Sequence, residues 1–87
     1  MRVEVGSKNW QNLETLMGSS MTVGTNYDVQ LVKGQQLMIV EGASEPQDDE
    51  DGNILEYNQG CTIKKESDNV YVKSFNAGCV INITEGE

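Results

Sequence analysis

Residues 69–84 read NVYVKSFNAGCVINIT and contain two runs rich in Val, Ile, Tyr and Phe. The runs are separated by a short break at residues 76–78, which ends in glycine. Two such runs around a Gly-containing break are typical of antiparallel strands joined by a tight turn. This stretch therefore predicts a β-hairpin at the C-terminal end of the chain.

The register of this hairpin follows from its apolar residues. A loop of two or four residues places four of them on one face, namely Val70, Val72, Ile81 and Ile83. A three-residue loop would instead set Val72 opposite Asn82. Because a slip of one residue moves a strand's whole apolar set to the other face, we expect the even loop and one buried face.

Alternation of polar and apolar residues predicts strands along most of the remaining chain. The clearest case is residues 26–33, where Tyr27, Val29 and Leu31 alternate with polar residues. Residues 2–5, 37–40, 53–57 and 61–65 also read as strands, and residues 21–23 begin an extended segment. Six to eight short strands with regular turn signals predict an all-β fold, a small antiparallel sandwich or barrel.

One segment, residues 8–17, has helical spacing. Its apolar positions are Trp10, Leu13 and Met17. Asn9 is expected to cap this short N-terminal helical turn and Gly18 to end it. We interpret Trp10 as a residue of the core or of its lid rather than one that stacks on a ligand.

Length and charge limit the possible functions. With 87 residues the chain is expected to form one domain, residues 1–87, with a thin core. Its net charge of −8, with only six Lys and Arg, argues against nucleic acid and anionic membranes as partners. No apolar run is long enough to span a membrane, and the first residues, MRVEV, lack the apolar core of a signal peptide. We therefore expect a protein made in the cytoplasm.

The polar segment 42–52 contains the only proline and the acidic run DDED at residues 48–51. A calcium loop is one interpretation, but Gln47 stands where the first carboxylate ligand belongs and no helices are predicted around it. We expect a solvated, mobile acidic loop instead, because like charges repel. Residues 85–87 are expected to form a tail.

Catalytic and metal-binding chemistry find little support in the sequence. The chain has two cysteines, Cys61 and Cys79, both at core positions of their predicted strands, and no histidine. A disulfide between them would add about 3 kcal/mol, but in a reducing cytoplasm we expect two free, buried thiols. Without histidine, Cys-His and Ser-His catalysis is excluded. Glu41, Glu45 and Glu56 have no predicted pocket, so we expect no catalytic, metal or cofactor site.

Four segments of the chain resemble small structural proteins of tailed bacteriophage virions. They are NWQNL at residues 9–13, VGTNYDVQ at 23–30, VYVKS at 70–74 and VINIT at 80–84. The resemblance implies a β-sandwich that decorates the outside of the phage head as a cement protein, or serves as a fibre or adaptor. It also implies a symmetric homo-oligomer, a trimer or a dimer, bound to the major capsid protein or another virion protein.

Residues 37–40, LMIV, are apolar on both faces. One face therefore needs a cover, either another copy or partner or the segment 8–17. Together with the aromatic positions, this predicts six interface residues: Trp10, Leu13, Met17, Met38, Val40 and Tyr57. Two other functions stay open. Tyr57 beside Asn58 and Gln59 suits a fibre module that binds host glycans, and the composition also suits a non-viral cytosolic interaction module.

Overall fold

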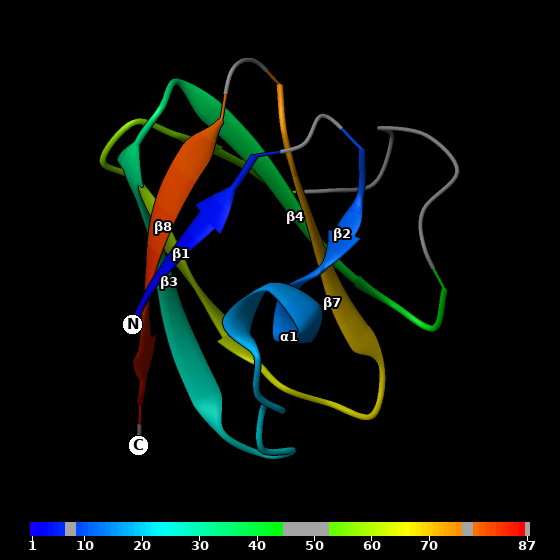
Figure 1. The fold of residues 1–87 in the computed structure, drawn as a ribbon. Helices are drawn as coiled ribbons and strands as arrows, with labels where there is room; N and C mark the ends of the chain where they lie inside the picture. Colours follow the sequence, from blue (N-terminus) through cyan, green and yellow to red (C-terminus); the bar gives the residue numbers. More distant parts are fainter. Residues whose placement is uncertain (7–8, 45–52, 76–77, 87) are drawn as a thin grey trace.

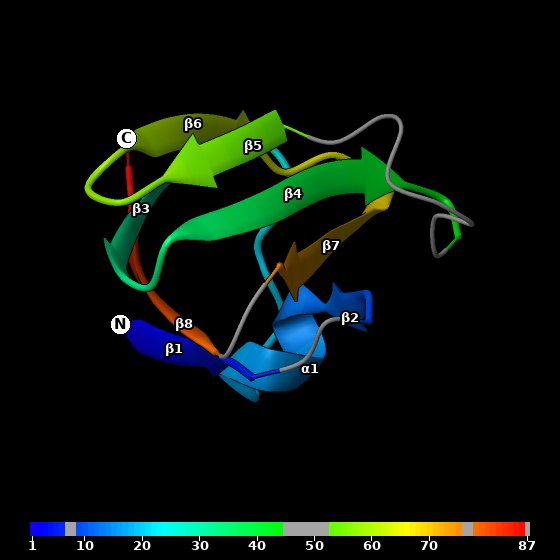
Figure 2. The ribbon, with the colours of Figure 1, turned by 90° about the horizontal axis from the view of Figure 1, so that it is seen from above.

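The computed structural model describes residues 1–6, 9–44, 53–75 and 78–86. Within them, eight strands form two four-stranded antiparallel sheets that pack face to face (Figures 1 and 2). Sheet I contains β1 (Arg2–Val5), β8 (Cys79–Glu85), β3 (Asn26–Lys33) and β6 (Gly60–Lys64), in that order. Sheet II contains β2 (Gln11–Asn12), β7 (Asn69–Ser74), β4 (Gln36–Gly42) and β5 (Asn53–Glu56), in that order.

The strand orders 1-8-3-6 and 2-7-4-5 define a jelly roll, the double-sheet arrangement of two Greek keys. Every pair of neighbouring strands is antiparallel. The sequence-based prediction of an all-β sandwich is therefore confirmed. Jelly rolls occur in viral capsid proteins, lectins and cupins, so the topology by itself does not select a function.

The core forms because alternate residues of each strand point into the space between the sheets. In β3 the alternation is complete, with Tyr27, Val29 and Leu31 buried. Leu37 and Ile39 of β4 meet these residues from sheet II within one hydrophobic cluster. Its other members lie at the inward positions of β1, β5, β6, β7 and β8, in α1 (Leu13–Met17) and at Met21 in the connection after α1.

The predicted C-terminal hairpin is wrong. Both strands exist, but β7 pairs with β2 and β4 in sheet II, whereas β8 pairs with β1 and β3 in sheet I. The chain thus crosses from one sheet to the other after Ser74 (Figure 2). The predicted apolar face is buried all the same, because Val70 and Val72 face Ile81 and Ile83 across the core instead of lying beside them.

The predicted helical turn is shorter and begins later than residues 8–17. Gln11 and Asn12 pair with Val72 and Tyr71 as strand β2, so α1 spans only Leu13–Met17. Asn12, not Asn9, caps the helix, because its Oδ1 accepts a hydrogen bond from the Glu14 backbone N–H at 2.9 Å. The predicted end at Gly18 is confirmed, with a left-handed φ of 74°.

Two further segments differ from their predictions. Residues 21–23 do not form a strand, because a turn closes there with a hydrogen bond from the Thr25 N–H to the Thr22 carbonyl at 3.2 Å. At the other end of the chain, β8 continues to Glu85, and the Gly86 N–H donates to the Asn26 carbonyl at 2.7 Å, so these two residues are ordered parts of sheet I's end rather than the expected tail. Residue 87 lies outside the described residues. The acidic run 48–51 lies outside the described residues.

Candidate interaction surface

The outward face of sheet II carries a cluster of large side chains, which we call the outer patch. Strand parity places its members opposite the core residues of β4, β5 and β7, and none belongs to the core cluster. The outer patch consists of Trp10, Met38, Val40, Ile54, Tyr71, Lys73 and Phe75.

Cross-strand pairs arrange these side chains in rows. Met38 lies between Lys73 of β7 and Ile54 of β5, and Val40 lies beside Tyr71. Met38 is only 2% exposed and Tyr71 9%, although both point away from the core, whereas Ile54 is 51% exposed. The centre of the outer patch is thus closely packed and its β5 side presents apolar surface to solvent.

A lysine sits between the two aromatic rings at one end of the outer patch. The Lys73 ammonium lies 5.7 Å from the centre of the Trp10 ring and 5.4 Å from that of Phe75. Both distances fall within cation–π range, in which each contact contributes about 0.5–1 kcal/mol at an exposed site. Because both contacts involve the same ammonium group, they hold the two half-buried rings in defined positions.

The outward face of sheet I is different in kind. Its strands present mainly polar side chains: Arg2, Glu4, Asp28, Gln30, Thr62, Lys64, Asn82 and Thr84. Many are exposed, and several are tied to one another. The Thr62 hydroxyl donates to Asp28 Oδ1 at 2.7 Å, and the Gln30 amide donates to Asn58 Oδ1 at 3.0 Å.

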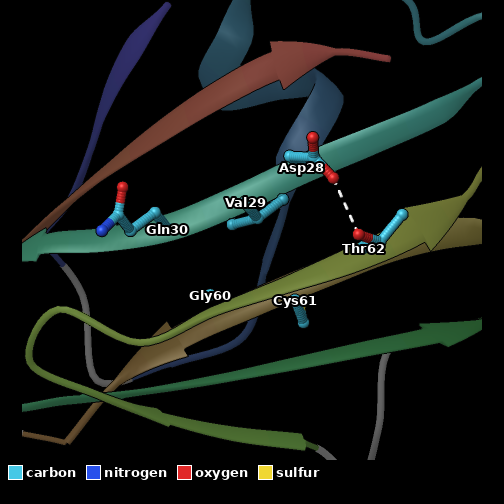
Figure 3. A pocket seen from close by; sticks show the side chains of 6 residues that line it. All are labelled: Asp28, Val29, Gln30, Gly60, Cys61 and Thr62. Atoms are coloured by element: carbon cyan, nitrogen blue, oxygen red, sulfur yellow. Dashed lines mark hydrogen bonds between the residues drawn. The ribbon is translucent and has the colours of Figure 1, made fainter. Parts of the chain in front are cut away.

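A shallow groove of about 290 Å³ crosses β3 and β6 on sheet I (Figure 3). Asp28, Gln30 and Thr62 supply its side-chain walls, and Gly60 leaves one position of β6 without a side chain. A Cβ at that position would lie 3.0 Å from the Val29 carbonyl oxygen and 3.6 Å from the Gln30 Cβ. The absence of a side chain on β6 therefore leaves the peptide backbone uncovered beside Gln30.

The six predicted interface residues occupy different environments. Trp10, Met38 and Val40 belong to the outer patch, as described above. Leu13 is fully buried in the core, and Met17 is partly buried against it. The Leu13 side chain is therefore core rather than surface in this fold.

Tyr57, the sixth predicted residue, is 66% exposed in the turn between β5 and β6. The side-chain amides of Asn58 and Gln59, next to it, form hydrogen bonds within the protein. The Asn58 side-chain oxygen Oδ1 accepts a hydrogen bond from the Gln30 amide, and the Gln59 side-chain oxygen accepts the Glu56 N–H at 3.0 Å.

Sequence reasoning missed Ile54, Tyr71, Lys73 and Phe75 as members of the outer patch. The alternation of residues 69–74 does contain the signal for Tyr71 and Lys73, because they fall on the face opposite Val70 and Val72. The meeting of Lys73 with Trp10 had no sequence signal. It depends on the pairing of β2 with β7, which brings residues about sixty positions apart to the same place.

The two cysteines are free and far apart in sheet I. Cys61 lies on β6 and Cys79 on β8, so strand β3 separates them, and Cys79 is four positions along β8 from Ile83, the residue level with Cys61. Burial raises the pKa of Cys61, and the nearby Asp28 carboxylate raises it further. Burial also raises the pKa of Cys79, and a backbone hydrogen bond of Gln36 lowers it by a smaller amount. Both thiols are therefore protonated at neutral pH and weak as nucleophiles.

The buried Lys65 ammonium forms an ion pair with Glu14. Lys65 is 4% exposed, lies 3.2 Å from the Glu14 carboxylate and donates to the Asp68 carbonyl. The second Glu14 oxygen accepts the Met21 N–H at 3.0 Å. The Glu14–Lys65 pair thus joins α1, the turn after it and the connection between β6 and β7.

The described residues offer neither a metal cluster nor a membrane-spanning helix. Within residues 1–6, 9–44, 53–75 and 78–86, no three His, Cys, Asp or Glu side chains gather closely enough to hold a metal ion. In the same ranges, no helix has the length and hydropathy needed to cross a membrane. Comparison with known proteins gave no match to a protein-family model, a curated protein or a solved structure.

Proposed function

We propose that this chain is a structural protein of a tailed-bacteriophage virion that decorates the outside of the head as a symmetric dimer or trimer. In this proposal the outer patch binds the major capsid protein, or another protein of the shell, and so stabilises the particle. The chain acts as a binding module and performs no catalysis.

The observation that carries this proposal is the outer patch itself. A sheet face that packs against nothing but solvent is normally polar, as the outward face of sheet I is. The outward face of sheet II instead carries Ile54, which is 51% exposed, beside the nearly buried Met38. Two half-buried aromatic rings lie on either side of Lys73. Aromatic anchors next to aliphatic groups are typical of protein interfaces, and their positions are fixed before binding, which lowers the entropic cost of association.

The virion part of the proposal rests on two weaker supports. One is the resemblance of the four segments to phage structural proteins. The other is the jelly-roll topology, which is common among capsid proteins but also occurs in other classes. An acidic chain of net charge −8 also suits the outside of a head, away from packaged nucleic acid.

Co-sedimentation with purified phage heads that lack this protein tests the proposal. We expect saturable binding at a fixed ratio to the shell protein. Ile54→Glu should abolish that binding with little effect on folding, because Ile54 is already half exposed. Thr84→Glu makes a matched charge change on the outward face of sheet I and should bind like the unmodified chain.

The pattern of results separates the alternatives. Binding to tail fractions but not to heads would replace the decoration role with that of a fibre or adaptor. Binding to neither would contradict the virion role and favour a non-viral interaction module. Equal loss with Ile54→Glu and Thr84→Glu would show that the outer patch is not the binding surface.

A second candidate function is glycan binding by a fibre module, favoured by one observation. Tyr57 is 66% exposed at the tip of the β5–β6 turn, where an aromatic ring can stack on a sugar. Titration with a panel of monosaccharides and host oligosaccharides, followed by NMR, tests it. Shifts at residues 57–60 that disappear in Tyr57→Ala would support glycan binding, and a panel without shifts would contradict it.

A further inference from the structure

We propose that two copies of this chain associate through β6, in antiparallel register about a two-fold axis at Thr62, with Lys64 of each copy lying across the Gly60 gap of the other. The inference deepens the symmetric oligomer in the proposed function and rests on that part of it. It uses different residues from the outer patch and does not depend on the identity of the shell protein.

Strand β6 forms an open edge of sheet I. β6 pairs with β3 on one side and is the last strand of its sheet. The Lys65 N–H donates to the Thr25 carbonyl at 3.0 Å, and the Lys65 carbonyl accepts the Gly24 N–H at 2.7 Å, so both groups of Lys65 point toward β3. Backbone groups alternate in direction along a strand. Those of Gly60, Thr62 and Lys64 therefore point away from the sheet, and all three residues are exposed.

Two β6 strands can pair only in a register that sets outward-pointing backbone groups of one copy against those of the other. In an antiparallel ladder, residues that exchange hydrogen bonds recur at every second position. Pairing Thr62 with Thr62 of a second copy places Gly60 opposite Lys64 in both directions. Each of these positions has its N–H and carbonyl directed outward, so one register satisfies all of them. A shift by one residue would set these positions against Cys61 or Ile63, whose N–H and carbonyl groups point toward β3, and no ladder would form.

The Lys64 side chain of a second copy fits the groove on β3 and β6. Neighbouring strands lie about 4.8 Å apart, so a residue paired with Gly60 stands two strand spacings from β3. Gly60 has no side chain in the way, and beyond it lie the Gln30 amide and the Asp28 carboxylate. The Thr62 hydroxyl donates a hydrogen bond to Asp28 Oδ1 and so orients the carboxylate. The long lysine side chain from the second copy can lie along the uncovered backbone with its ammonium group at these acceptors.

Charge explains why the second copy suits this edge better than an arbitrary strand. A lysine on an edge strand normally discourages pairing, because it brings a charge to the partner. Here that lysine meets an acceptor-rich groove in a chain of net charge −8, and the two-fold axis repeats the contact. Within the described residues Lys64 forms no ion pair. The edge is thus self-complementary in backbone, shape and charge.

Amide hydrogen exchange of the purified chain at low and high protein concentration tests the register directly. We expect Thr62 and Lys64, and with them Gly60, to exchange more slowly as the concentration rises. The alternate amides of Cys61 and Ile63 already bond to β3 and serve as internal controls that change little. A chain that sediments as a monomer throughout, or a dimer in which the Thr62 amide stays unprotected, overturns the proposal.

Charge variants provide a second test, by sedimentation. Lys64→Glu should weaken self-association about tenfold or more, because it sets a carboxylate against Asp28. Combining it with Asp28→Lys should restore association. Lys33→Glu, the same charge change at an exposed position of β3 away from this edge, should have no such effect. Equal weakening by Lys64→Glu and Lys33→Glu would contradict the assigned contact.

Binding to phage heads separates this inference from the proposed function. If an unmodified chain binds heads but never pairs through β6, the inference fails and the decoration role stands. If it pairs through β6 but binds no virion component, the inference stands and the decoration role fails.

Discussion

The outward faces of the two sheets differ although their inward faces are alike. Sheet I and sheet II each supply aliphatic side chains to one shared core. Outward, sheet I presents Asp28, Gln30 and Thr62 in a hydrogen-bonded polar surface, whereas sheet II carries the exposed Ile54 beside the nearly buried Met38. Burial in the shared core explains the inward faces. The more apolar outward face of sheet II is, in our proposal, a binding surface.

The contrast also shows how a small fold can separate two tasks. In our proposal the outer patch binds a different protein, because Ile54 and the two aromatic rings suit a complementary apolar partner. The open edge of sheet I is polar and offers backbone hydrogen bonds, which suit a strand.

The largest losses of stability are expected for substitutions on the two inward faces, and the two faces should give similar losses. Leu31 of sheet I and Leu37 of sheet II are both 0% exposed. Leu31→Ala and Leu37→Ala should each lower the free energy of unfolding by about 2–5 kcal/mol, through lost burial and the cavity left behind. Urea denaturation measures both. A loss below about 1 kcal/mol for either variant would mean that its sheet contributes less to the core than the structure indicates.

The next effect distinguishes the outward faces. Trp10→Ala should weaken binding to phage heads by about 2 kcal/mol, roughly thirtyfold, if the ring is an interface anchor. It should lower the free energy of unfolding by only about 1 kcal/mol, mainly through the lost contact with Lys73. Thr84→Ala on sheet I should change neither quantity. Thermal unfolding and co-sedimentation of the same samples provide the comparison, and a parallel loss of stability and binding would assign Trp10 to folding alone.

A smaller effect is expected where the two sheets are tied together. Lys65 follows β6 of sheet I, and its partner Glu14 lies on α1, which packs against β7 of sheet II. Glu14→Gln leaves the buried Lys65 charge without its counterion. Because Glu14 is partly exposed, we expect a loss of about 2 kcal/mol, less than for a fully buried pair. Glu4→Gln, at an exposed position of β1, is the control and should cost less than about 0.5 kcal/mol.

The smallest effect concerns the two thiols on the inward side of sheet I. Their pKa values are raised above the ordinary 9.0, chiefly by burial. The folded state therefore holds these protons more tightly than the unfolded state, so the stability from the neutral thiols is full below pH 9.0 and declines as the pH rises through the folded pKa values. Alkylation rates measured against pH should rise later for the folded chain than for the chain in urea. Coincident profiles would contradict the buried environment of both thiols.

Much of the fold could be predicted from local patterns. Strand β3 was evident from the alternation of Tyr27, Val29 and Leu31, and the end of α1 from Gly18. The start of α1 was not, because Gln11 and Asn12 pair with β7, and this pairing outweighs a weak helical pattern in so short a segment. Of the candidate surface, Trp10, Met38 and Val40 were found from the sequence. The helical spacing of residues 8–17 also placed Leu13 at an apolar position but could not tell a core position from a surface one.

By itself, the sequence determined the class of the fold and the residues that share a face, because both follow from the two-residue period of a strand. Only the tertiary structure decided which strands are neighbours. Val70, Val72, Ile81 and Ile83 are buried equally well in a hairpin or across a sandwich, so hydrophobic burial could not choose between the two. The same long-range pairing brought Lys73 to Trp10 and placed Gly60 beside Gln30 on an open edge. Both candidate surfaces therefore depend on contacts between residues far apart in the chain.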